Sequence, residues 1–244
     1  MIYPVKINCK CKILNHMKSY FNIDINLLKE YDKAGPRYTS YPTAPYFHSG
    51  ITSKEYIKEI HLRNKETHNE NISLYFHIPF CDTMCYFCGC NMLISKKPEF
   101  IDCYIDYLIR EMDLLMPHLE MKKNIGQMHW GGGSPNSMTP EQIKKLGDQI
   151  KTGFSFDQDA EIAVEIDPRG LSFEHMQAFK EVGFNRFSMG IQDFNQKVQK
   201  AINRIQSEEI TWNAFKWGRN LGYKSINIDL IYGLPYQTPE NFLY

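Results

Sequence analysis

The chain of 244 residues is 43% hydrophobic and 23% charged, a composition that can bury a core and excludes a disordered or membrane-embedded chain. Its 28 basic and 28 acidic residues give no net charge, which excludes a general nucleic-acid binder. No stretch approaches the roughly 18 apolar residues of a membrane span, and the N-terminus lacks the apolar segment of a secretory signal. These features predict a cytoplasmic protein with no membrane span.

The first 70 residues show no clear hydrophobic period. Residues 1–30 are rich in Asn and Lys and are predicted to form a poorly structured N-terminal extension. Residues 31–70 are predicted to form an extended segment with a short helix, because Pro, Gly and Tyr are dense between positions 31 and 50. Cys9 and Cys11 have no partner pattern and are interpreted as unstructured thiols.

From residue 71 onward, predicted strands alternate with predicted helices. Alternating apolar residues and turn signals indicate five strands, at 72–78, 127–130, 161–166, 184–190 and 225–232. Apolar residues at steps of three and four indicate helices between them, at 101–115, 143–150, 172–183 and 210–221. This order is typical of βαβ units and predicts an α/β fold with a parallel sheet, whose functional groups gather at the C-terminal ends of the strands.

The predicted sheet is incomplete. Thr238 and Pro239 are typical of a helix start, but the sequence ends at Tyr244. Five strands do not close an eight-stranded barrel. We therefore expect residues 71–244 to form an incomplete parallel (β/α) barrel, truncated at its C-terminus.

Four of the seven cysteines lie within ten residues, directly after the first predicted strand: Cys81, Cys85, Cys88 and Cys90. Three thiolates at the spacing C-x3-C-x2-C can surround one iron–sulfur cluster from a single loop. A structural zinc site typically has a second pair of ligands, and none is near, so a [4Fe–4S] cluster is favoured over zinc or buried thiols. Three ligands leave one iron open for a small molecule, although by spacing alone Cys90 could be a fourth ligand.

This cysteine spacing resembles the signature of the radical S-adenosylmethionine (SAM) enzymes. Further motifs make the resemblance specific to the oxygen-independent coproporphyrinogen III oxidases (coproporphyrinogen III dehydrogenases). They occur in order as RYTSYPTAPYF at 37–47, YFHIPFC at 75–81, CYFCGC at 85–90, HWGGGSP at 129–135, VEIDPR at 164–169, FNRFSMGIQDFN at 184–195 and NIDLIYGLPYQTPE at 227–240. The resemblance implies that the incomplete barrel is of the radical SAM type.

The resemblance also implies the ligands of each cofactor. Cys81, Cys85 and Cys88 match the cysteines that bind the [4Fe–4S] cluster, whereas Cys90 matches a cysteine that is not a ligand. Two SAM molecules are implied. The contacts of the cluster-bound SAM match Tyr75, Gly132 and Glu165, and those of the second SAM match Phe87, Gly133, Ser134, Gln192, Arg204 and Asp229. No catalytic side chain is implied.

The implied reaction is the anaerobic oxidative decarboxylation of two propionate side chains of coproporphyrinogen III, which gives the vinyl groups of protoporphyrinogen IX in haem biosynthesis. A 5′-deoxyadenosyl radical from SAM starts it. The implied partners are the porphyrinogen substrate and an electron donor such as flavodoxin or ferredoxin, and a full-length enzyme is expected to be a monomer.

Two alternative functions are a haem-binding chaperone of a related radical SAM group and an inactive cluster-binding fragment. Cys90 and the RYTSYPT segment favour the oxidase over the chaperone.

Overall fold

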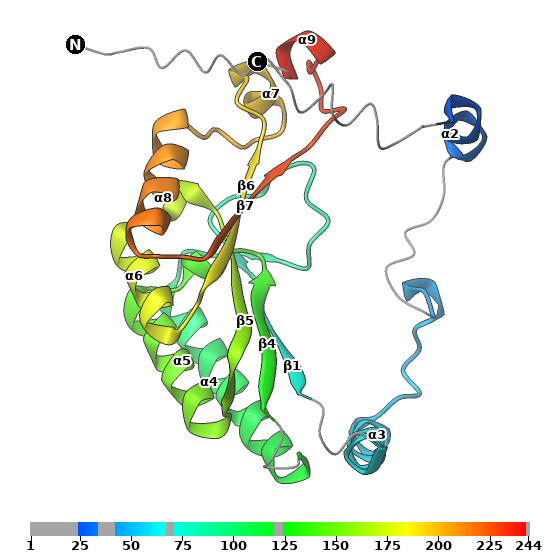
Figure 1. Cartoon of the computed structure of the whole chain (residues 1–244), viewed down its shortest axis with the longest axis vertical. Helices are drawn as coiled ribbons and strands as arrows, with labels where there is room; N and C mark the ends of the chain where they lie inside the picture. Colours follow the sequence, from blue (N-terminus) through cyan, green and yellow to red (C-terminus); the bar gives the residue numbers. More distant parts are fainter. Residues whose placement is uncertain (1–23, 34–41, 67–70, 120–123, 243–244) are drawn as a thin grey trace. The chain divides into compact units, whose positions relative to one another are not determined.

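The computed structural model describes residues 24–33, 42–66, 71–119 and 124–242 (Figure 1). The chain divides into two compact units, Met1–Thr52 and Ser53–Tyr244. This boundary differs from both boundaries expected from the sequence, at residues 30 and 70. The reason is helix α3 (Ser53–Glu66), which belongs to the C-terminal unit and not to an extended N-terminal segment.

The N-terminal unit contains helix α2 (Ile25–Tyr31) and the 3-10 helix η1 (Ala44–Tyr46). The side chain of Asp24 accepts hydrogen bonds from the backbone N–H groups of Asn26 and Leu27, at 2.8 and 3.4 Å. Asp24 thus caps a short helix at the end of the extension that we predicted to be poorly structured. The prediction is corrected for these residues. The other residues of the extension, with Cys9 and Cys11, lie outside the described residues.

A parallel sheet forms the centre of the C-terminal unit. Its strands follow the order β1-β4-β5-β6-β7, and each is parallel to its neighbour. The bounds are β1 (Ile72–Ile78), β4 (Ile125–Gly132), β5 (Phe156–Ile166), β6 (Arg186–Gln192) and β7 (Ser225–Leu230). Each strand is thus added at the same edge of the sheet, as in an unclosed (β/α) barrel, and the predicted α/β fold is confirmed. The described residues do not close a barrel.

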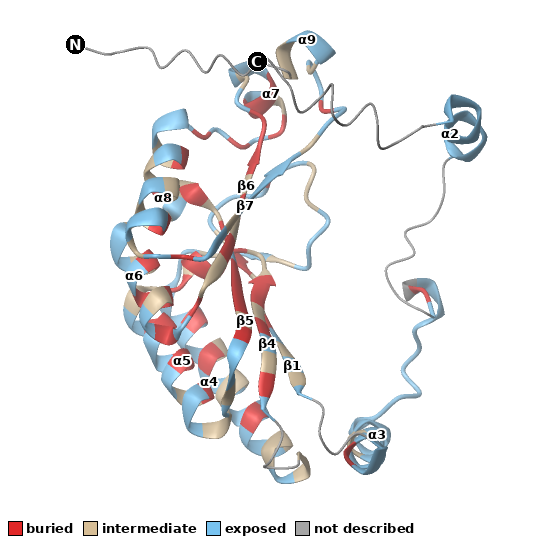
Figure 2. Ribbon diagram, viewed as in Figure 1, coloured by how far each residue is buried: buried red, intermediate tan, exposed pale blue. Residues whose placement is uncertain are grey.

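Four helices cover one face of this sheet (Figure 1). They are α4 (Pro98–Leu115), α5 (Pro140–Gly153), α6 (Phe173–Val182) and α8 (Glu208–Asn220). The shorter elements are α7 (Gln196–Ala201), α9 (Pro239–Phe242), η2 (Met116–His118), η3 (Pro135–Ser137), η4 (Pro168–Gly170) and the strand pair β2 (Phe80–Cys81) and β3 (Leu93–Ile94). Buried residues concentrate between the helices and the strands (Figure 2).

Local capping signals set the helix ends. Thr139 and Gln142 form a capping box at the start of α5, and Ser172 and His175 form one at the start of α6. Helix α6 ends at Gly183, whose φ of 114° is left-handed. Because glycine has no Cβ, it adopts this conformation without strain. The predicted glycine end of this helix is confirmed.

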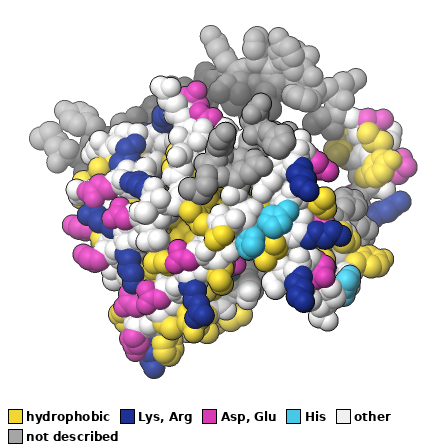
Figure 3. Space-filling view, turned by 90° about the horizontal axis from the view of Figure 1, so that it is seen from below, with side chains coloured by type: hydrophobic (Ala, Val, Ile, Leu, Met, Phe, Trp, Pro, Cys, Tyr) yellow, Lys and Arg dark blue, Asp and Glu magenta, His cyan; other side chains and the backbone are white. Residues whose placement is uncertain are grey.

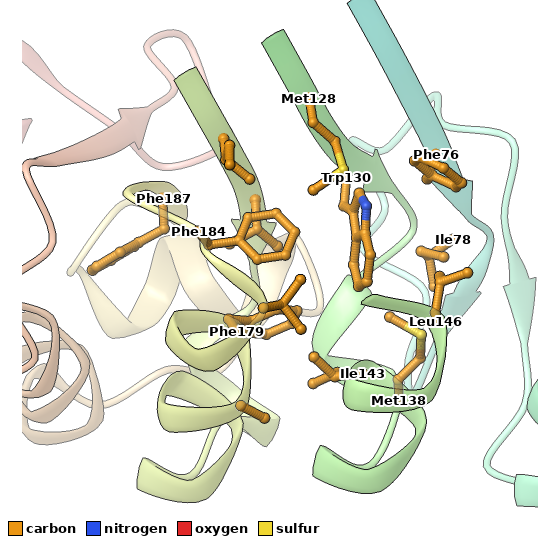
Figure 4. Close-up of a cluster of buried hydrophobic side chains, with 14 of the residues drawn as sticks. Phe76, Ile78, Met128, Trp130, Met138, Ile143, Leu146, Phe179, Phe184 and Phe187 are labelled. Atoms are coloured by element: carbon orange, nitrogen blue, oxygen red, sulfur yellow. The ribbon is translucent and has the colours of Figure 1, made fainter. Parts of the chain in front are cut away.

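Aromatic packing joins strand β4 to helix α6. Trp130, Phe179 and Phe184 are fully buried, and the Trp130 ring meets the other two edge-on, with centroid distances of 6.2 and 4.9 Å (Figure 4). Such edge-to-face pairs add to the stabilisation that comes from burying the rings. This packing holds strand β4 in place, and β4 leads into the glycines at 131–133.

The surface is mixed in charge. Figure 3 shows basic and acidic side chains interspersed with apolar ones on the face that it presents. At the sheet edge, β7 presents Ile228 and Leu230, which are 45% and 53% exposed. None of the described helices is long and apolar enough to cross a membrane.

Candidate functional site

A cavity of about 230 Å³ lies at the C-terminal ends of the strands. Most of the residues predicted to bind cofactors line it: Cys81, Cys85, Phe87, Cys88, Gly132, Gly133, Glu165, Gln192, Arg204 and Asp229. The structure therefore brings together side chains from the cysteine loop and from four different strands. Ser134 lines a neighbouring cavity of about 490 Å³, which shares Cys81 and Asp167 with the first. Tyr75 lies outside both.

The cysteine loop follows the short strand β2. Cys85 is buried, Cys81 and Cys88 are half-buried, and Cys90 is exposed. The backbone N–H of Cys88 donates to the carbonyl of Cys85 at 3.0 Å, which folds the loop into a tight turn. Within the described parts of the chain, no group of three or more His, Cys, Asp or Glu converges on a single metal ion. The three thiols line one cavity, and in a [4Fe–4S] cluster each thiolate binds a different iron.

Backbone contacts hold the glycine turn of β4 against the start of the cysteine loop. The N–H of Gly133 donates to the carbonyl of Ile78, and the N–H of Ser134 to that of Phe80, both at 2.8 Å. A Cβ on Gly133 would lie 2.7 Å from the Phe80 carbonyl oxygen and 2.8 Å from Pro79. Glycine is thus required here for close backbone packing, independently of any ligand.

Asp167, at the end of β5, holds two arginines beside the cysteine loop. Its carboxylate accepts from Arg169 Nη2 at 2.6 Å and from Arg204 Nη1 at 3.0 Å. Burial by itself would raise the pKa of Asp167, but the hydrogen bond from Arg169 and the charges of the two arginines outweigh it, so this pKa is lowered. Asp167 and Arg169 were not among the predicted site residues, although both lie in the VEIDPR motif.

Arg204 has an unpaired buried donor. It is buried, its Nη2 donates to the carbonyl of Gly190 at 2.7 Å, and its Nε has no partner among the described residues. An unpaired buried donor is costly, but this atom has no exposed surface and does not face the cavity. Arg204 lines the cavity, and its role in holding a SAM molecule stays a prediction.

The acidity of Cys81 is relevant to metal uptake. Burial, followed by the negative charge of Asp167, raises the pKa of the Cys81 thiol to about 11. Without metal, Cys81 is therefore a thiol at neutral pH. Because thiolates are the metal ligands, cluster binding must release its proton.

A second polar network surrounds Glu165. His129 Nε2 donates to its carboxylate at 3.1 Å, and this bond lowers the pKa of Glu165 against the effect of burial, with a further contribution from the backbone of Gly132. The ring of Tyr75 stacks on that of His129, with centroids 5.9 Å apart. Tyr75 therefore joins the site through His129 and not through the cavity wall. The role of His129 was missed, although it lies in the HWGGGSP motif.

Tyr75 is oriented from its other side by His77. The Tyr75 hydroxyl lies 3.1 Å from His77 Nδ1, and His77 Nε2 lies 2.7 Å from the carbonyl oxygen of Asn91. Since a carbonyl only accepts, Nε2 carries the proton and Nδ1 accepts from the hydroxyl. Burial, and then the charge of Glu165, raise the pKa of Tyr75, so the hydroxyl stays protonated and can donate.

Asp229 is positioned by neighbours on two strands. Ser188 Oγ donates to it at 3.0 Å and Asn227 Nδ2 at 2.9 Å. Ser188 was not predicted, because only the pairing of β6 with β7 places it beside Asp229. The arrangement presents a carboxylate with a fixed orientation, which can accept hydrogen bonds from ribose hydroxyls or an ammonium group.

Gln192 and Phe87 complete the wall of the cavity. Gln192 is buried with a φ of 70°, an uncommon conformation for a residue other than glycine and one often found at functional sites. Phe87 packs against a small apolar cluster of Val198, Ile202 and Leu234. Its ring is thereby fixed at the cavity.

The fold, the cysteine loop and the polar strand ends define an enzyme core that uses an iron–sulfur cluster and SAM. The chain belongs to the radical SAM superfamily, whose family model matches residues 75–243. Members of this superfamily bind a [4Fe–4S] cluster and SAM, in agreement with the cofactors predicted from the sequence.

More specific similarity is to oxygen-independent coproporphyrinogen III oxidases. The chain is 43% identical to the Pseudomonas aeruginosa enzyme and 44% identical to one from Helicobacter pylori, over 90% and 91% of its length. Among solved structures, it matches coproporphyrinogen III oxidase from Escherichia coli, a radical SAM enzyme, with a TM-score of 0.79 and 39% identity. It covers 48%, 49% and 48% of these three proteins, so the chain spans about half the length of the relatives it matches.

Proposed function

We propose that Cys81, Cys85 and Cys88 bind a [4Fe–4S] cluster, and that the protein acts in the oxygen-independent oxidative decarboxylation of coproporphyrinogen III to protoporphyrinogen IX. The observation that carries this proposal is that the three cysteines line one cavity together with polar groups from several strand ends. When bound, such a cluster supplies the electron for reductive cleavage of SAM. The identity to coproporphyrinogen III oxidases supports the porphyrinogen as substrate.

The residues near the cluster loop are proposed to hold the first SAM. Glu165, ionised and fixed by His129, would accept from an ammonium or ribose hydroxyl group. Gly132, with a φ of 115°, lets the backbone turn toward the ligand without a side chain. Tyr75, whose hydroxyl proton is donated to His77, would accept from the ammonium or a ribose hydroxyl through a lone pair of its oxygen.

A second SAM is proposed to lie on the β6 and β7 side of the cavity. Arg204 lines the cavity there, and Asp229 offers a carboxylate held by Ser188. The other residues proposed for this ligand are Phe87, Gly133, Ser134 and Gln192. As for the whole protein, we propose a monomer in the cytoplasm that receives electrons from a flavodoxin or ferredoxin.

The test is an anaerobic turnover assay. The chain is reconstituted with iron and sulfide, reduced with dithionite, and given SAM and coproporphyrinogen III, and 5′-deoxyadenosine and protoporphyrinogen IX are quantified. SAM cleavage coupled to product would support the proposal. SAM cleavage without product, together with tight haem binding, would favour the haem-binding chaperone. A cluster without SAM cleavage would favour the inactive cluster-binding fragment.

A matched pair of variants tests the site itself. Glu165→Gln removes the charge from the cavity, and because hydrogen bonds to charged groups are worth about 1.5–3 kcal/mol, it should raise the SAM concentration needed for half-maximal cleavage about tenfold or more. Glu161→Gln, on the same strand but paired with Arg186 away from the cavity, should not. Equal behaviour of the two variants would contradict the assignment of Glu165.

A further inference from the structure

Two guanidinium groups approach the sulfur of Cys85. Arg169 Nη2 donates to Cys85 Sγ at 3.3 Å, and Arg204 Nη1 lies 3.6 Å from the same sulfur. Neither Cys81 nor Cys88 receives a side-chain hydrogen bond from a described residue. Among the three cysteines, these guanidinium donors therefore contact the buried one, Cys85.

Asp167 fixes Arg169 in this orientation. Arg169 Nε lies 3.0 and 3.1 Å from the two carboxylate oxygens of Asp167, and Nη2 lies 2.6 Å from one of them. An Nη group carries two N–H bonds, so Arg169 Nη2 can serve Asp167 with one and Cys85 with the other. The arginine and aspartate side chains are only 20% and 19% exposed. The planar guanidinium, always charged, is thus held in one geometry.

We propose that Arg169 is a positioning residue that donates a hydrogen bond to the sulfur of Cys85 and thereby raises the reduction potential of the bound cluster. This inference rests on the proposed cluster ligation. Reduction adds negative charge that the thiolate sulfurs share, and donors or cations at a sulfur stabilise the reduced form. Arg169 would therefore make the electron needed for SAM cleavage easier to load onto the cluster.

The experiment compares midpoint potentials of anaerobically reconstituted chains. The variants are Arg169→Met, Arg169→Lys and the control Arg186→Met, which breaks an arginine–glutamate pair (Arg186 Nη1 to Glu161, 2.9 Å) at the start of β6. Iron content is measured first, and the potential then follows from redox titration monitored by electron paramagnetic resonance. The readout needs neither SAM nor substrate.

In an Arg169→Met chain with wild-type iron content, the ratio of reduced to oxidised cluster at a fixed potential should be about tenfold lower. This corresponds to a midpoint potential about 59 mV more negative for one electron. Arg169→Lys keeps the charge without the planar fork and should shift less, and the control should not shift. An unchanged potential in Arg169→Met would refute the proposal. Loss of iron in both Arg169 variants would assign a purely structural role, which also refutes it. A wild-type chain that binds no iron would overturn the proposed function as well.

Discussion

Replacing Gly133 with alanine tests the backbone packing that holds the cysteine loop. The added Cβ would lie 2.7 Å from the Phe80 carbonyl oxygen and 2.8 Å from Pro79, whereas ordinary contact begins at 3.4 Å, so the segments must separate by roughly 0.7 Å. The contacted atoms belong to the backbone and no side-chain rotation relieves the clash. The movement would also stretch the bonds from the N–H groups of Gly133 and Ser134.

The expected cost follows from these contacts. Overpacking costs about 1–3 kcal/mol and each of the two weakened hydrogen bonds about 0.5–1.5 kcal/mol, so Gly133→Ala should lower the free energy of unfolding by about 2–6 kcal/mol. It should also displace Cys81, which directly follows Phe80, and so lower the iron bound on reconstitution.

Gly170→Ala is the matched control. Gly170 lines the neighbouring cavity, but its Cβ would lie 3.8 Å from the nearest atom, Asn136 Nδ2, and its φ is not left-handed. This variant should change the free energy of unfolding by less than about 0.5 kcal/mol. Urea unfolding followed by tryptophan fluorescence, with iron analysis, decides the comparison. If Gly133→Ala matches both the wild type and Gly170→Ala in stability and iron, the packing argument is wrong.

Two further predictions concern pH and helix packing. Burial lowers the pKa of His175 below its ordinary value of 6.5. As the pH falls, His175 therefore binds a proton in the unfolded chain before it does so in the folded chain. The free energy of unfolding should fall as the pH decreases from about 7 to 5. His175→Gln keeps a capping-box residue and should flatten this part of the curve of unfolding free energy against pH; an unchanged slope would refute the assignment. Gly147→Ala should cost about 1–3 kcal/mol in urea unfolding, because its Cβ would overlap the side chain of Val182 where α5 meets α6. Val182→Ala in the same chain should recover part of that loss, and additive losses would contradict the predicted clash.

The sequence predicts the elements of the core because their signals are local. Alternation identifies the strand at Ile72–Ile78, and Gly183 marks a helix end that the structure confirms. Helix α2 was missed because it is only seven residues long and buries none of its side chains. Strand bounds differed by a few residues, as at β4, which begins at Ile125.

The contacts within the site depend on register and long-range approach, which sequence patterns do not encode. Tyr75 stacks on His129 because the pairing of β1 with β4 sets them side by side. Arg169 meets Cys85 across 84 positions, from a 3-10 turn to an irregular loop. Neither segment has a hydrophobic periodicity from which this contact could be predicted. The resemblance supplied the predicted cofactor ligands, whereas the residues that contact and orient these side chains came from the structure.

The most direct test of the account is the iron content of single cysteine variants after anaerobic reconstitution. Cys81→Ala, Cys85→Ala and Cys88→Ala should each lose the cluster absorption near 400 nm and most of the roughly four irons expected per chain for such a cluster. Cys90→Ala and the control Cys103→Ala, at an exposed position on α4, should keep both. A full cluster in any of the first three variants, or about one zinc per chain in the wild type, would contradict the assignment of a [4Fe–4S] site to this loop.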